Sequence, residues 1–139
     1  MSRLIKFLTA LMLIAVGNMP AVNAEIQTYE GVGIYHMAKT SETLNQAKNE
    51  AKKYAGRAIL EQIELYIASE SEVRDFNLTK DEIVTIAAGV MNVTSAKYRY
   101  MPEEADPDQF VVECLLTAEV DTDRVHEYVE RERQARLQR

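Results

Sequence analysis

Cysteine is nearly absent from this sequence, since Cys114 is the only one among 139 residues. A single cysteine cannot form a disulfide within the chain, so packing alone must hold the fold. The sequence also lacks a Gly-x-Ser-x-Gly turn, the motif that presents a hydrolase serine. Cys114 itself is expected to face the core, where a thiol behaves as a small hydrophobe. We therefore predict a protein that is not an enzyme and uses no cofactor.

Metal-ligating side chains are also scarce. His36 and His126 are the only histidines, and they lie on separate expected elements. A zinc site needs three or four convergent ligands, so a surface or structural role is favoured for both. The acidic stretch 103–108 lacks the glycine and the terminal bidentate Glu of a calcium loop, which favours a solvated turn. No metal site is predicted.

No apolar run reaches the roughly 20 residues that a transmembrane helix needs. The apolar run 7–16 follows two basic residues and precedes the small-residue triplet 22–24. This order is typical of a secretory signal peptide, with cleavage expected after Ala24. The region has no cysteine to receive a lipid. We predict a signal peptide at 1–24 and one domain at 25–139, periplasmic or secreted, with no membrane span.

Acidic residues outnumber basic ones by 22 to 16, so the formal charge is −6. Arg3 and Lys6 would leave with the signal peptide, which has no acidic residue, and the charge would become −8. Such a surface repels nucleic acid and anionic lipid, so no nucleic-acid partner is expected.

A basic tail ends the chain at about 131–139. It contains four arginines that form a candidate partner surface: Arg131, Arg133, Arg136 and Arg139. The alternative is a solvated helix end, with ion pairs from Glu127 to Arg131 and from Glu132 to Arg136, because positive charge is favourable at a helix C-terminus.

Tyr29 to Met37 is predicted as a strand with Gly31 and Gly33 on one face. Glycines at this spacing suggest that a large group, either a helix backbone or an aromatic ring, packs closely there. A hydroxyl in 39–41 is expected to cap a long helix that runs to about Ser69. Its apolar face repeats every three or four residues and is rich in alanine. The positions of this face include Leu44, Ala47, Ala51, Ala55, Ala58, Leu60, Ile63 and Ile67.

The following segment, 70–78, is predicted as a loop in which Val73 and Phe76 contact the core. Thr79 and Glu82 then match a capping box that begins a second helix. Two strands are expected at 93–101 and 109–120, the second with a clear buried face at alternate positions from Phe110. Asp121 is expected to cap a terminal helix.

These elements give the order β-α-α-β-β-α, which predicts an α+β fold of two layers. The sheet is expected to be three-stranded, with the first and second strands parallel at the edges and the third antiparallel between them. The helices are expected to cover one face.

From Glu30 to Glu130 the sequence resembles the N-terminal domain of the flagellar assembly protein T family, which is similar to small outer-membrane lipoprotein modules. The resemblance rests on Gly31 and Gly33, the alanine-rich helix ending at 63–69, the start at 79–83, and the Val120-Asp121 exit from the last strand. It implies an envelope domain that binds other proteins, and it carries over no catalytic residue.

The sequence thus favours an exported, non-enzymatic cell-envelope module that binds other envelope proteins. Self-association through an edge strand is one form of such binding. A small-ligand or metal-binding periplasmic protein is the alternative, and a closed apolar pocket lined by tyrosines would favour it.

Overall fold

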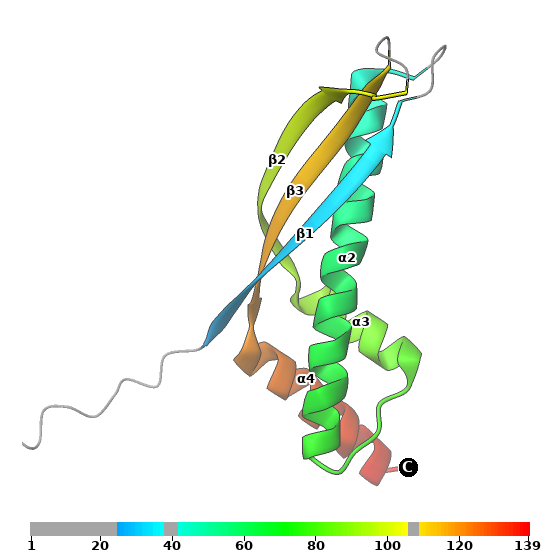
Figure 1. Ribbon diagram of the computed structural model, residues 1–139. Coiled ribbons are helices and arrows are strands. Elements are labelled where there is room, and N and C mark those ends of the chain that lie inside the picture. Colours follow the sequence, from blue (N-terminus) through cyan, green and yellow to red (C-terminus); the bar gives the residue numbers. More distant parts are fainter. Residues whose placement is uncertain (1–24, 38–41, 106–108) are drawn as a thin grey trace, which may run out of the picture.

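The computed structural model describes residues 25–37, 42–105 and 109–139, so the predicted signal peptide lies outside the described residues. Three strands form one sheet, and helices pack against it (Figure 1). In chain order the elements are β1 (Ile26–His36), α2 (Leu44–Val73), α3 (Lys80–Val90), β2 (Asn92–Pro102), β3 (Phe110–Asp121) and α4 (Thr122–Leu137).

The sheet has the order β1-β3-β2, and β3 is antiparallel to both neighbours. Cys114, at the middle of β3, lies opposite Gly33 on β1 and opposite Tyr98 on β2. The two edge strands are therefore parallel to each other. This confirms the predicted α+β fold and its strand order.

The buried stripe of α2 and the alternate residues of β3 together form most of the core. On α2 every fourth side chain is buried, because this spacing keeps residues on one face of a helix. On β3 the buried side chains alternate, as predicted, although Phe110 itself is 50% exposed. The core residues of the two elements are Ala47, Ala51, Ala55, Ile59, Ile63, Ile67, Val112, Cys114, Leu116, Ala118 and Val120.

Gly31 and Gly33 bring the backbone of α2 directly onto β1. A Cβ atom at Gly31 would lie 2.4 Å from the Ala55 carbonyl oxygen, and one at Gly33 would lie 1.9 Å from the Ala51 carbonyl oxygen. No side chain fits in that space. The prediction that a large group packs on the glycine pair is confirmed, and of the two expected groups it is the helix backbone.

The ends of α2 differ from the predicted ones. Thr43 caps the helix through a capping box with Gln46, whereas the expected cap at 39–41 lies outside the described residues. The helix then continues past Ser69 to Val73, through part of the predicted loop. Leu44 is 47% exposed and Val73 is 81% exposed, so both predictions of inward packing were wrong. Each lies in a terminal turn, where the helix has passed the surface that covers its apolar stripe.

Helices α3 and α4 pack beside the C-terminal part of α2, beyond one end of the sheet (Figure 1). Thr79 caps α3 by accepting a hydrogen bond from the Glu82 amide, at 3.3 Å. Asp121 caps α4 in the same way for the Asp123 amide, at 2.9 Å. Both predicted N-caps are confirmed, and of the predicted capping box at Thr79 the structure shows the half in which the hydroxyl accepts from the Glu82 amide. The buried side chains of the two helices are Ile86, Ala87, Val90, Thr122, Val125 and Val129.

Candidate functional site

The four arginines of the predicted partner surface have different surroundings. Arg136 lies over the Phe76 ring, 4.6 Å from its centroid, and it also donates to the Asn77 carbonyl oxygen. Its guanidinium donates to both carboxylate oxygens of Glu82, each at 2.7 Å. The interpretation of Arg136 as a solvated residue paired with Glu132 was therefore wrong.

The other three arginines remain near solvent. Arg131 lies over the Tyr128 ring, 5.2 Å from its centroid, and Arg133 lies 3.6 Å from a Glu130 oxygen. Arg139 is exposed near the end of α4. The side chains of Arg131 and Arg133 thus contact residues of α4 itself.

Arg136 instead ties α4 to the start of α3. Its guanidinium holds the pKa of the Glu82 carboxyl below the usual value, mainly through the hydrogen bonds between them. A lowered folded-state pKa stabilises the fold above the unfolded pKa, and this stabilisation is lost as the pH falls through the folded pKa.

We expect Arg136→Gln to lower the free energy of unfolding by about 1 to 2 kcal/mol at pH 7, because the pair is only partly buried. The loss should shrink at acid pH, where Glu82 becomes protonated. Urea unfolding at pH 7 and at acid pH measures the loss of unfolding free energy. Arg139→Gln is the matched control. Equal effects of the two substitutions would contradict the role assigned to Arg136.

Strand β2 is the least covered part of the sheet. None of its residues is buried, whereas β3 is buried at alternate positions. A helix is about 10 Å wide and strands lie about 4.8 Å apart, so one helix covers about two strands. The glycine pair fixes α2 over β1 and β3. The helix-side face of β2 is left partly open: Tyr98 packs against the core, whereas Val93 and Tyr100 are exposed.

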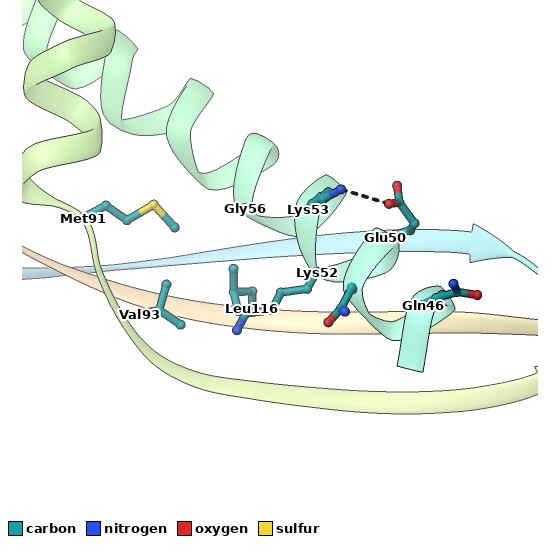
Figure 2. Close-up of a pocket in the computed structure, with 9 residues that line it drawn as sticks. Gln46, Glu50, Lys52, Lys53, Gly56, Met91, Val93 and Leu116 are labelled. Carbon is teal, nitrogen blue, oxygen red and sulfur yellow. Dashed lines mark hydrogen bonds and ion pairs between the residues drawn. The ribbon is translucent and has the colours of Figure 1, made fainter. Parts of the chain in front are cut away.

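A groove lies between α2 and the start of β2, with a volume of about 530 Å³ (Figure 2). We name it the α2–β2 groove. Its wall is polar and comes from α2, while its floor is apolar and comes from β3 and the entry to β2. The wall residues are Gln46, Asn49, Glu50, Lys52, Lys53 and Gly56, and the floor residues are Met91, Val93 and Leu116.

Positive charge gathers along the wall of the α2–β2 groove. Lys53 pairs with Glu50 at 3.0 Å, and Lys48 lies 4.6 Å from the centroid of the Tyr98 ring. In the described part of the chain, Lys52 has no carboxylate partner within ion-pair distance. The lining of the groove itself therefore holds two lysines, Lys52 and Lys53, against one glutamate, in a protein of net charge −6.

The outer edge of β2 offers free main-chain groups. Glu103 donates its amide to the Gln109 carbonyl, so in this antiparallel ladder the odd-numbered residues of β2 face β3. Ala96, Tyr98 and Tyr100 then direct their amides and carbonyls outward. The β1 edge is more occupied, since Gln62 donates to the Glu30 carbonyl oxygen at 2.9 Å.

The candidate metal and nucleophilic residues are not brought together. His36 lies 3.3 Å from Glu103, and His126 lies 3.0 Å from Glu70. Within residues 25–37, 42–105 and 109–139 no group of three potential metal ligands occurs, while residues 106–108 of the acidic tip lie outside this part. Cys114 is 0% exposed, and burial raises the pKa of its thiol.

Sequence reasoning missed the α2–β2 groove. One signal for it was present, since Gly56 interrupts the side chains of α2. This signal does not state how far α2 is displaced from β2. That displacement follows from the glycine pair only once the sheet is assembled.

None of the helices in the described ranges combines the length and apolar content needed to cross a membrane. No family model, curated protein or solved structure matches the chain.

Proposed function

We propose that this protein is an exported, non-enzymatic module of the cell envelope that binds another protein through β2 and the α2–β2 groove. The observation that carries the proposal is the exposure of β2 on both faces and along its outer edge. Soluble proteins cover or protect such strands unless a partner uses them. The resemblance to the N-terminal domain of the flagellar assembly protein T family supports the same class of role.

The placement in the envelope rests on the signal-peptide pattern at 1–24. Cleavage after Ala24 would give a protein that begins at Glu25. Mass measurement of the protein recovered from the periplasmic fraction tests this step. A mass that retains Met1, or recovery only with detergent, would overturn the proposed location.

Binding is tested by placing a photo-crosslinking amino acid at Tyr100, which is 44% exposed on β2, and irradiating cells that make the full chain. We expect a discrete protein adduct from this position. The matched control is Leu65, which is 73% exposed on α2 and away from β2, and it should give none. Adducts of equal yield from both positions, or none from β2, would contradict the proposed function.

A further inference from the structure

We infer that the α2–β2 groove binds an acidic amphipathic helix of another envelope protein. This inference rests on the proposed function and specifies the chemistry of the partner. It follows from three properties of the groove: its apolar floor, its basic wall and its length.

The apolar floor selects a helix over an extended segment. Met91 and Val93 present apolar side chains beside Leu116, which is itself 1% exposed, and none of the three offers a strong hydrogen-bonding group. A segment lying on them must satisfy its own backbone amides and carbonyls, because an unpaired buried group costs free energy. A helix does so internally, and its apolar stripe supplies the matching surface.

The basic wall selects acidic residues beside that stripe. Lys52 and Lys53 line the groove, and only Lys53 has a carboxylate partner, Glu50, within ion-pair distance in the described ranges. An acidic residue of the incoming helix would face Lys52 at the edge of the apolar contact. Complementary charge of this kind selects partners and suppresses wrong ones.

The groove also matches the size of a short helix. Its wall runs from Gln46 to Gly56, which corresponds to about 15 Å at the helical rise of about 1.5 Å per residue. About three turns of a partner helix have this length. Laid beside α2, that helix would cover the strand that α2 leaves open, and it would complete the two-layer packing of the sheet.

The test places a photo-crosslinking amino acid at Val93, which is 43% exposed on the groove floor, in the full chain in its own cells. After irradiation, mass spectrometry identifies the attached peptide. We expect a peptide of another protein with more acidic than basic residues and with apolar residues three and four positions apart. The matched control position is Ile34, which is 49% exposed on the outer face of the sheet.

Two pairs of variants test the charge of the groove wall and the space that the groove leaves for a partner. Lys52→Glu should lower the adduct yield about tenfold, because it places like charges together. Arg57→Glu makes the same charge change on the solvent side of α2 and should leave the yield unchanged. Gly56→Glu should also lower the yield, while Gly56→Ala should not, because its Cβ meets only Leu116, at 3.8 Å. Thermal midpoints show that each variant remains folded.

Each other outcome has a defined meaning. The inference of an acidic partner helix would be overturned by three other kinds of adduct at position 93: a neutral or basic peptide, a peptide of this same chain, or a small molecule. An adduct at Tyr100 without one at Val93 would overturn this inference and leave the proposed function standing. The absence of adducts at both positions would overturn both.

Discussion

Gly33→Ala is expected to lower the free energy of unfolding by about 3 kcal/mol or more, at or above the usual range for overpacking. The new Cβ would lie 1.9 Å from the Ala51 carbonyl oxygen and 2.5 Å from the Ala55 amide nitrogen. Both are backbone atoms of α2, so no side-chain rotation relieves the clash. The helix must move away from β1, and the core between them loosens. The free energy of unfolding of a small domain is only about 5 to 15 kcal/mol, so this substitution would remove a large share of it.

Urea unfolding followed by circular dichroism measures this loss. Gly89→Ala is the matched control, since a Cβ there meets Tyr128 at an ordinary 3.7 Å. It should be neutral or slightly stabilising, because alanine is the better helix former. A Gly33→Ala protein as stable as the control would show that α2 does not rest on β1 as described.

Leu116→Ala is expected to cost about 2 to 5 kcal/mol, through lost burial and the cavity left behind. Leu116 is 1% exposed on the helix side of β3, beneath α2. Its neighbour Leu115 has the same side chain on the outer face of the sheet, where it is only partly buried. Leu115→Ala should therefore cost clearly less.

Thermal melts of the two alanine variants provide the comparison. Because the pair differs only in the face of one strand, the difference between the two losses measures how much α2 contributes to the core. Equal losses would mean that the outer face of the sheet is also covered, and would place a further contact there.

Much of the fold follows from local patterns in the sequence. The alternation along β3 predicted its buried face, and the four-residue spacing along α2 predicted its core stripe. Thr79 and Asp121 predicted two helix starts, because their side chains can accept from amides in the first turn. The glycine spacing on β1 predicted the close approach of a large group, which is the backbone of α2.

The errors come from contacts between distant residues. Arg136 and Glu82 are 54 positions apart, so the local spacing within α4 suggested the wrong partner. Leu44 was placed in the core because periodicity identifies a helix face but not where the packed surface ends. Val73 was placed there as an apolar residue of a predicted loop, whereas α2 continues through it and leaves it exposed. The α2–β2 groove depends on the sideways position of α2, which no single segment encodes. The candidate site therefore required the assembled sheet.

The burial of Cys114 means that oxidants can reach its thiol only before the protein has folded. The folded protein keeps this thiol 0% exposed and raises its pKa, so the reactive thiolate is both scarce and out of reach. On the proposed route to the envelope, the chain meets oxidants before β3 is covered by α2. On this route the rate of folding sets how long the thiol remains open to mixed-disulfide formation.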